Sequence, residues 1–325
     1  MNILVTGGAG FIGSNLTDAL IADGHNVTVL DNFATGKREN LEHLKDCPSF
    51  TLIEGDIRDR ETCARAVEGK DIVYHEAALG SVPRSIKDPM TSTDVNIGGF
   101  VNMLFAAKEA KVHRFVYAAS SSTYGDSKTL PKVEDKIGNP LSPYAITKYV
   151  NELYARNFHD LYGIDTIGLR YFNVFGRRQD PNGAYAAVIP KFALALMAHE
   201  PPTINGDGTY SRDFTYIDNV IQANKLAGFT ENPEALNTVY NVAFGERTTL
   251  NDLYSWLRAN LGVYDPEILA LEAKYGPNRA GDIPHSLADI SKARSLLGYA
   301  PQFSVKDGLK EAAKWYYDYL KTVLF

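Results

Sequence analysis

The chain begins with a glycine-rich turn between an expected strand and an expected helix. Residues 2–6 form an apolar run short enough for a buried strand, and residues 12–23 carry apolar side chains at helical spacing. Between them, Gly7, Gly10 and Gly13 permit, in that order, a tight turn, close approach of backbone N–H groups to a pyrophosphate, and close packing of the helix on the strand. The sequence therefore predicts a dinucleotide-binding βαβ unit, with the phosphates at the positive end of the helix.

A carboxylate follows the second expected strand. Residues 26–30 form another apolar run that ends at Asp31, where a carboxylate can accept hydrogen bonds from a ribose diol. This position favours NAD over NADP as the cofactor. Lys37 and Arg38 lie nearby and leave the phosphorylated cofactor open as an alternative.

Composition excludes several other classes of protein. The 325 residues include 33 basic and 39 acidic side chains, with no basic block that would attract a nucleic acid. No apolar run approaches the roughly 20 residues that span a bilayer, and no charged leader precedes the first strand, so we expect a cytoplasmic protein without a membrane partner. Cys47 and Cys63 form no disulfide framework, and the seven histidines lack metal-ligand pairing, so no metal is expected.

Strands and helices alternate through the first half of the chain. The expected strands are 2–6, 26–30, 50–54, 71–75, 113–119 and 164–170, and the expected helices between them include 12–23, 60–68, 91–110 and 143–161. This alternation predicts an α/β fold with a doubly wound parallel (Rossmann) sheet. We expect an NAD-binding Rossmann domain at 1–172 and a smaller α/β substrate-binding domain at 173–325, with part of 211–245 able to return to the first. The amphipathic stretch 304–322 predicts a packed terminal helix.

Tyr144 and Lys148 form a candidate proton-transfer pair. They are four residues apart at the start of an expected helix, with Ser142 as its N-cap, so both side chains project from one face. A free phenol titrates near pH 10, so ionisation near neutrality requires a shift of roughly three units, about 4 kcal/mol. A neighbouring ammonium and a cationic nicotinamide ring are charges of the required sign. Together with the glycine turn, this pair indicates nicotinamide redox chemistry.

Over essentially its whole length the chain resembles the extended short-chain dehydrogenase/reductases, and within them the nucleotide-sugar 4-epimerases. The elements that carry the resemblance are, in chain order, Gly7, Gly10 and Gly13; Asp56-Ile57; Ala77-Ala78; Asn96; Ser120-Ser121-Ser122-Thr123-Tyr124-Gly125; Tyr144 with Lys148; and Leu169-Arg170-Tyr171-Phe172-Asn173-Val174-Phe175-Gly176. Each element alone is modest evidence for the resemblance, but the order in which all of them occur is specific to the family.

The resemblance implies a set of NAD-binding residues. Asp56 and Ile57 would hold the adenine, and Asp31 and Asn32 the adenosine ribose. The full set is Gly7, Gly10, Phe11, Ile12, Gly13, Asp31, Asn32, Gly36, Asp56, Ile57, Ala77, Ala78, Asn96, Tyr144, Lys148 and Tyr171.

The resemblance also implies catalytic and substrate-binding roles. Tyr144, as a phenolate, would take the proton of the sugar 4-hydroxyl, and Lys148 would lower the pKa of that tyrosine and bind the nicotinamide ribose. A serine of the pair Ser120-Ser121 would bond the same sugar oxygen; counting back from Tyr124 favours Ser120. The implied substrate-binding residues are Gly80, Ser81, Arg84, Ser120, Ser121, Asn173, Ala187, Val188, Lys191, Arg212, Arg279, Asp282 and Ser286.

Among those residues, Asn173 and Arg212 would bind a diphosphate, and Arg279 and Asp282 a phosphate or the uridine ribose. An ordinary loop ion pair between Arg279 and Asp282 is the alternative interpretation.

The sequence favours epimerisation of a UDP-sugar over related reactions. Dehydratases of this kind carry an acidic pair after the catalytic hydroxyl, where this chain has Ser121-Ser122, and no uronate clamp for a decarboxylase is evident. A non-catalytic dinucleotide-binding subunit is a further alternative, but it would not need the intact serine, tyrosine and lysine set.

Two stretches, 78–85 and 182–191, are similar to the subgroup that interconverts UDP-N-acetylglucosamine and UDP-N-acetylgalactosamine, enzymes of polysaccharide biosynthesis. Gly80, Ala187 and Ser286 are small, which would leave volume for an acetamido group. UDP-glucose and UDP-galactose stay open as further substrates.

The resemblance further implies a homodimer that pairs through helices 91–110 and 143–161. Four apolar residues of these helices are candidate contacts or, alternatively, core residues: Phe105, Tyr149, Leu153 and Phe158.

Overall fold

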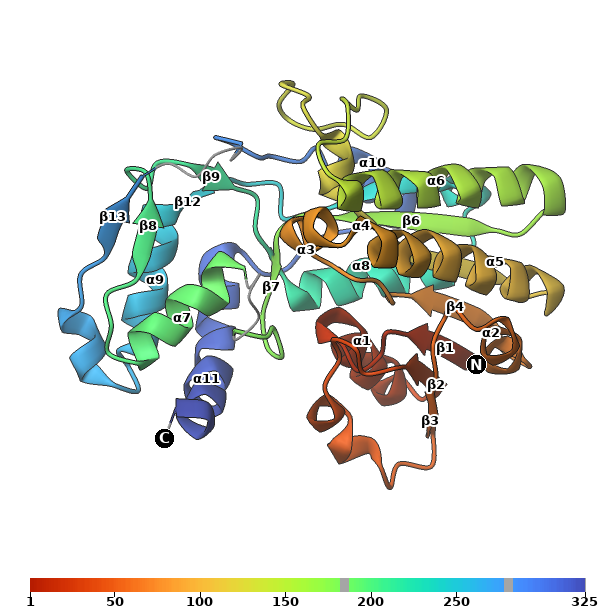
Figure 1. Ribbon diagram of the computed structural model, residues 1–325, viewed down its shortest axis with the longest axis horizontal. Coiled ribbons are helices and arrows are strands. Elements are labelled where there is room, and N and C mark those ends of the chain that lie inside the picture. Colours follow the sequence, from red (N-terminus) through yellow and green to blue (C-terminus); the bar gives the residue numbers. More distant parts are fainter. Residues whose placement is uncertain (182–186, 278–282, 325) are drawn as a thin grey trace.

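A parallel sheet of seven strands organises the larger part of the molecule (Figure 1). The computed structural model describes residues 1–181, 187–277 and 283–324. Within them the sheet order is β11-β6-β5-β4-β1-β2-β3, and all neighbouring strands run parallel. Its strands are β1 (Asn2–Thr6), β2 (Asn26–Asp31), β3 (Phe50–Glu54), β4 (Ile72–His75), β5 (Arg114–Ser120), β6 (Thr166–Tyr171) and β11 (Thr238–Val242). The predicted doubly wound α/β fold is confirmed.

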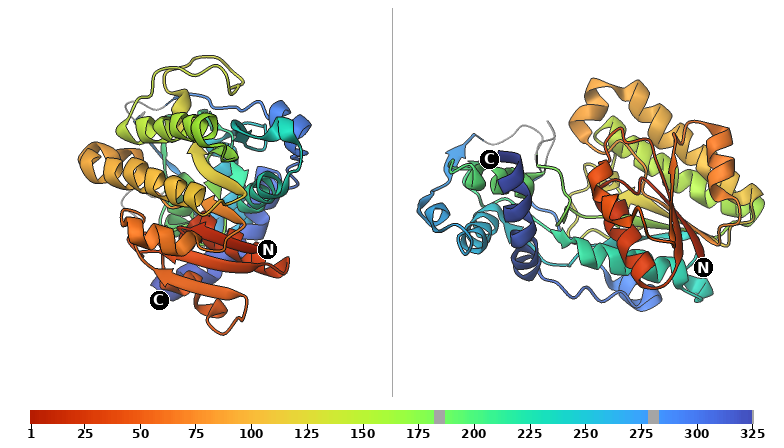
Figure 2. Two further views of the ribbon diagram at one scale, coloured as in Figure 1. Left: turned by 90° about the vertical axis from the view of Figure 1, so that its right-hand side faces the viewer. Right: turned by 90° about the horizontal axis from the view of Figure 1, so that it is seen from below.

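Helices cover both faces of this sheet (Figure 2). One face carries α1 (Phe11–Ala22) and α8 (Ile217–Phe229), and the other α2 (Arg60–Val67), α5 (Phe100–Glu109) and α6 (Pro143–Tyr162). The alternation along β1 matches these layers, because Ile3 and Val5 belong to one buried cluster and Leu4 to the other. Strands buried on both faces are therefore continuously apolar, as the first run of the sequence is.

The expected helix 91–110 is confirmed as one continuous helical segment, 89–109, but a π-helical stretch interrupts its regular α-helical geometry. The structure has α3 (Val82–Lys87) and α4 (Pro89–Thr93), then a π-helical segment, Asp94–Gly99, that leads directly into α5. The wider turn directs the buried Asn96 toward the chain after β4, where its side chain bonds the backbone of Leu79. Such π-helical turns commonly occur where a side chain needs a placement that a regular helix does not provide.

A smaller set of helices and short strands lies beside the sheet (Figure 1). Its helices are α7 (Val188–Met197), α9 (Leu250–Leu261), α10 (Ser291–Leu297) and α11 (Val305–Leu324). Its short strands are β7 (Val174–Phe175), β8 (Thr203–Asn205), β9 (Ser211–Arg212), β10 (Thr215–Tyr216), β12 (Thr248–Thr249) and β13 (Lys274–Gly276). The predicted terminal helix is confirmed as α11, which packs against α7 and α9.

β11 and α8 come from the second half of the chain but lie with the large sheet. Both elements fall within the range 211–245. The division of the chain into two domains at residue 172 stays a prediction. No helix of the described residues combines the length and the apolar character needed to cross a bilayer.

Candidate active site

The glycine turn leaves no room for side chains. Gly7 has a φ of +68°, and a Cβ there would lie 2.7 Å from the backbone nitrogen of Ala77. A Cβ at Gly13 would lie 2.3 Å from the carbonyl oxygen of Gly7, and one at Gly36 would lie 2.8 Å from the Cβ of Ala9. Because backbone atoms block the first two positions, glycine is needed for α1 to approach β1 and β4 this closely.

The N-terminus of α1 opens into a cavity. Gly10 is the N-cap residue and offers no side chain to the first turn. Phe11, Ile12 and Gly13 line the cavity, and the N–H groups of a first helical turn have no acceptor within the helix. Since the helix dipole adds positive potential at this end, the arrangement fits a pyrophosphate.

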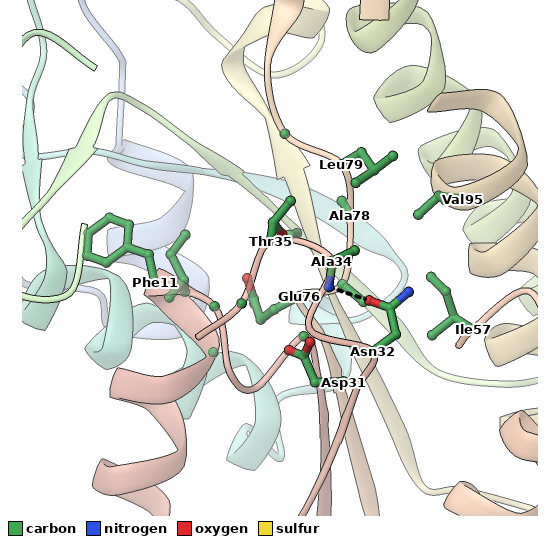
Figure 3. A pocket seen from close by; sticks show the side chains of 18 of the residues that line it. Phe11, Asp31, Asn32, Ala34, Thr35, Ile57, Glu76, Ala78, Leu79 and Val95 are labelled. Carbon is green, nitrogen blue, oxygen red and sulfur yellow. Dashed lines mark hydrogen bonds between the residues drawn. The ribbon is translucent and has the colours of Figure 1, made fainter. Parts of the chain in front are cut away.

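The cavity has a volume of about 430 Å³ and lies over the carboxyl ends of the strands. In Figure 3, Phe11 lies on one side of it and Ile57, Val95 and Leu79 on the other. Most of the predicted cofactor residues and several substrate residues line it: Gly7, Gly10, Phe11, Ile12, Gly13, Asp31, Asn32, Gly36, Asp56, Ile57, Ala77, Ala78, Gly80, Ser120, Tyr144, Lys148, Tyr171 and Asn173.

The carboxylates of Asp31 and Asp56 accept hydrogen bonds that hold together the loops at one end of the cavity. Asp31 accepts hydrogen bonds from the backbone N–H groups of Ala9 and Phe33, both at 2.8 Å, so it joins the end of β2 to the glycine turn. Asp56 accepts from Asn32 at 2.8 Å, and a bidentate contact with Arg58 lowers the pKa of Asp56 to about 2. Figure 3 shows Asn32 accepting in turn from the backbone of Ala34.

Lys37 and Arg38, the basic residues for which NADP was considered as an alternative cofactor, both bind other groups of the protein. The Lys37 ammonium donates to the Tyr319 hydroxyl at 2.7 Å and to Asp180 at 3.3 Å. The Arg38 guanidinium pairs with Glu54 at 2.7 Å and lies 4.0 Å from the centre of the Phe33 ring. With the Asp31 carboxylate beside them, this end of the cavity fits a ribose diol better than a ribose phosphate.

The candidate catalytic side chains meet at the other end of the cavity. Ser142 caps α6, as predicted, by accepting from the N–H of Ala145 at 3.1 Å, and Tyr144 and Lys148 both line the cavity. The Lys148 ammonium donates to the carbonyl of Ala118 at 2.8 Å and lies 6.0 Å from the centre of the Tyr144 ring.

Ser120, rather than Ser121, reaches the tyrosine. Ser120 lines the cavity and makes a side-chain hydrogen bond with Tyr144, whereas Ser121 does not line it. The Ser120 hydroxyl also accepts from the Ser122 hydroxyl at 2.9 Å. The structure thereby agrees with the count back from Tyr124, which favoured Ser120.

Burial dominates the pKa shifts of Tyr144 and Lys148. Burial raises the pKa of Tyr144 above its ordinary value, and the contact that opposes this rise is the hydrogen bond with Ser120. Burial also lowers the pKa of Lys148, to about 8. Desolvation acts against the charged forms of both side chains in the protein by itself, and the lowering of the tyrosine pKa by Lys148 and a cationic nicotinamide ring stays a prediction.

Other predicted residues lie outside the cavity. Asn96 is buried and bonds the backbone of Leu79 and the hydroxyl of Thr147. Ser81 caps α3, and four further residues are described but line neither this cavity nor the next: Arg84, Ser121, Lys191 and Ser286. Arg279 and Asp282, and residues 182–186 of the second subgroup stretch, lie outside the described residues.

A second cavity, of about 240 Å³, adjoins the first, because Asn173 and Val174 line both. Ala187, Val188 and Arg212 line it as predicted, and the Arg212 guanidinium donates to the carbonyls of Ser211 and Pro284. The sequence interpretation missed several polar and aromatic residues of its lining: Phe175, Gln179, Asn205, Tyr210 and Phe214. Phe175 belongs to the motif at 169–176, and the signal of the others was their position after the first domain.

Glu76 is a further residue that the interpretation did not single out. It follows β4, lines the first cavity and accepts a hydrogen bond of 2.7 Å from Tyr171. Among the described residues no three His, Cys, Asp or Glu side chains gather as a possible metal site.

The strand order, the glycine turn and the set Ser120, Tyr144 and Lys148 define a dinucleotide-binding α/β protein with a proton-transfer site. The sequence profile of the NAD dependent epimerase/dehydratase family matches residues 3–243, and the chain belongs to this family. The expected family, fold and NAD dependence are thereby confirmed.

Three similar proteins illustrate the relationship. The structure of a UDP-N-acetylglucosamine 4-epimerase from Methanobrevibacter ruminantium M1, in complex with UDP-N-acetylmuramic acid, is 40% identical, with a TM-score of 0.91 and 98% of each chain covered. A UDP-glucose 4-epimerase from Thermotoga maritima, solved with UDP-glucose, is 38% identical, with a TM-score of 0.89 and coverage of 98% of this chain and 100% of that one. A putative UDP-glucose 4-epimerase from Methanocaldococcus jannaschii is 37% identical over 96% of this chain and 97% of its own length.

Proposed function

We propose that this protein is a cytoplasmic NAD-dependent 4-epimerase that interconverts UDP-N-acetylglucosamine and UDP-N-acetylgalactosamine for polysaccharide biosynthesis. The observation that carries the proposal is the junction of the two cavities at Asn173 and Val174. One cavity has the glycine turn and the Ser120, Tyr144 and Lys148 set, and the other has Arg212 and aromatic side chains suited to a nucleotide. A nucleotide in the second cavity would therefore extend its sugar toward the tyrosine.

The residues at this junction can move the proton that the reaction requires. When bound, NAD would supply a reversible hydride acceptor for the sugar C4 position. Tyr144 accepts the proton of the sugar 4-hydroxyl and later returns it, while Ser120 hydrogen-bonds the same oxygen. Lys148 supplies positive charge and binds the nicotinamide ribose. Such general base catalysis contributes about 10²- to 10⁴-fold to a rate.

Dehydration and decarboxylation are less well supported. Elimination of water needs an acid and a base near the sugar C5 and C6, but Ser121 and Ser122 follow Ser120, and the Ser122 hydroxyl is bonded to Ser120. A non-catalytic dinucleotide-binding subunit would have no use for a serine bonded to a half-buried tyrosine beside a lysine.

The preference for an acetylated sugar is supported by small residues. Gly80 lines the first cavity and is exposed, and a Cβ there would meet no atom within 4 Å. Ala187 lines the adjoining cavity and carries only a methyl group. Ser286 lies beside the arginine-bearing strand, since its N–H donates to the carbonyl of Ser211 at 3.1 Å.

The proposal is tested by incubating purified protein with UDP-glucose, UDP-galactose and their two N-acetylated counterparts and resolving the products. We expect interconversion of the acetylated pair without added cofactor or metal. Activity that requires free NADPH, or that a chelator abolishes, would contradict the proposal.

Ser286→Tyr tests the acetamido pocket. The resemblance to epimerases that act only on non-acetylated sugars would place a bulky tyrosine at position 286. The variant should therefore fill space that the 2-acetamido group needs. We expect kcat/KM to fall at least about tenfold for UDP-N-acetylglucosamine and to stay similar or rise for UDP-glucose. Ser295→Tyr, on the exposed surface of α10, is the control. An equal fall for both substrates would show that Ser286 does not select between them.

We also propose a homodimer that pairs through α5 and α6. Phe105 and Leu153 are 49% and 51% exposed, and Ile146 and Leu161 extend this apolar surface along α6. Phe158 is only 6% exposed, which supports the alternative that it is a core residue. Tyr149 is half-buried.

Leu153→Glu should convert the dimer to a monomer, because an unpaired carboxylate would have to be desolvated at the interface. Sedimentation at micromolar concentration measures this, with Val263→Glu, at a 76% exposed site outside α5 and α6, as the control. A wild-type monomer would reject the pairing.

A further inference from the structure

Glu76 is a carboxyl group held rigidly inside the first cavity. It comes directly after β4, and Figure 3 shows it between Phe11 and Asn32. Its Oε1 accepts from the Tyr171 hydroxyl at 2.7 Å, and the same hydroxyl accepts from the amide of Asn224, a fully buried residue of α8, at 2.9 Å. Partners from β6 and α8 thus fix the orientation of a group that faces the cofactor site.

Four titratable groups surround this carboxyl. They are Tyr74 from β4, Tyr144 and Lys148 from α6, and Tyr171 from β6. Burial raises the pKa of Glu76 to about 7, while the Tyr171 hydrogen bond and the Lys148 charge act to lower it. The carboxyl therefore changes from neutral to charged close to neutral pH.

The charge of Glu76 works against the proton-transfer step by itself. It raises the pKa of Tyr144 and so disfavours the phenolate that acts as the base. Its position is accordingly not explained by activation of the tyrosine. The remaining charge that develops and disappears in this cavity is that of the nicotinamide ring, which is cationic when oxidised and neutral when reduced.

We infer that Glu76 is a positioning residue whose carboxylate favours the oxidised, cationic form of the bound cofactor over the reduced, neutral form. The inference rests on the NAD-dependent reaction proposed above. In that reaction the C4–H bond of the sugar breaks with its electron pair moving to the cofactor, and the O4 proton moves to Tyr144. A negative charge that stabilises the oxidised form favours return of the hydride, and with it completion of each turnover.

The test measures which redox form the protein retains, with no sugar present. Holoprotein is exchanged to equilibrium in a fixed mixture of NAD and NADH and re-isolated, and the bound forms are quantified after denaturation. For Glu76→Gln we expect the bound ratio of NAD to NADH at pH 8.5 to fall about tenfold relative to wild type, as for loss of one charge interaction inside a protein. Glu109→Gln, a surface change on α5, should keep the wild-type ratio.

The pH dependence identifies the group. As pH falls from 8.5 to 5.5 the wild-type ratio should fall toward that of Glu76→Gln, because the carboxylate is protonated on passing pH 7. Lys148 and Tyr144 titrate in both proteins, so the difference between them reports Glu76. Tyr171→Phe keeps the carboxyl but removes a hydrogen bond that lowers its pKa, and should move the midpoint of this difference to higher pH.

An unchanged ratio in Glu76→Gln, or equal losses of both cofactor forms, would overturn the inference. Thermal unfolding checks that each variant is folded. If Glu76→Gln does not fold, the pH dependence of the bound ratio in Tyr171→Phe provides the test. Because no sugar is used, a failed epimerase assay with the expected redox ratio would reject the proposed substrate and leave the role of Glu76 standing.

Discussion

Tyr144→Phe should lower kcat at least about 10²-fold, because the substitution removes the group that accepts the sugar proton. The Kd for the UDP-sugar should stay close to that of the wild type, since the residues proposed to bind the diphosphate, Asn173 and Arg212, are untouched. Single-turnover kinetics and calorimetry measure the two quantities separately. Tyr154→Phe removes a hydroxyl from an exposed position on the same helix and should be neutral. Wild-type turnover in Tyr144→Phe would show that another residue is the base.

The pH profile of kcat provides a second readout of this site. Because burial raises the pKa of Tyr144, the fraction present as phenolate, and with it the rate, should rise with pH. Ser120→Ala removes the hydrogen bond that lowers this pKa, so the midpoint of the rise should move to higher pH. A profile that does not move would mean that Ser120 does not act on the tyrosine.

Gly13→Ala should reduce cofactor retention by at least about tenfold and destabilise the fold by about 1–3 kcal/mol. The new Cβ would lie 2.3 Å from the carbonyl of Gly7 and 2.8 Å from the Cα of Gly8, so α1 would have to move away from the turn. That movement would displace the N–H groups proposed to bind the pyrophosphate. The NAD content of the purified protein and its thermal unfolding measure the two effects.

Gly98→Ala is the matched control, because a Cβ at Gly98 would meet no atom within 4 Å and its backbone needs no positive φ. It should retain NAD and stability. Equal behaviour of the two variants would mean that the close approach at Gly13 does not matter for cofactor binding.

Much of the fold was predictable because its signals are local. The six strands β1 to β6 were each expected within two residues of their observed bounds, since buried parallel strands are continuously apolar. The cap at Ser142 and the spacing of Tyr144 and Lys148 also follow from neighbours in sequence. The π-helical turn inside the expected helix 91–110 was not predictable, because it accompanies a contact between Asn96 and Leu79, which lie on different segments.

The sequence by itself determined the glycine turn, the acidic end of β2, the order of the motifs and hence the family. These features depend on residue types and on their spacing along the chain, and the local backbone geometry of a single segment limits both. Only the tertiary structure bonded Ser120 to Tyr144, assigned Phe158 to the core and engaged Lys37 with Tyr319. It also brought Glu76 and Tyr171 together across the end of β5. These outcomes depend on which distant segments meet and on how much water they exclude, and burial and charge pairing of this kind have no signal in local spacing.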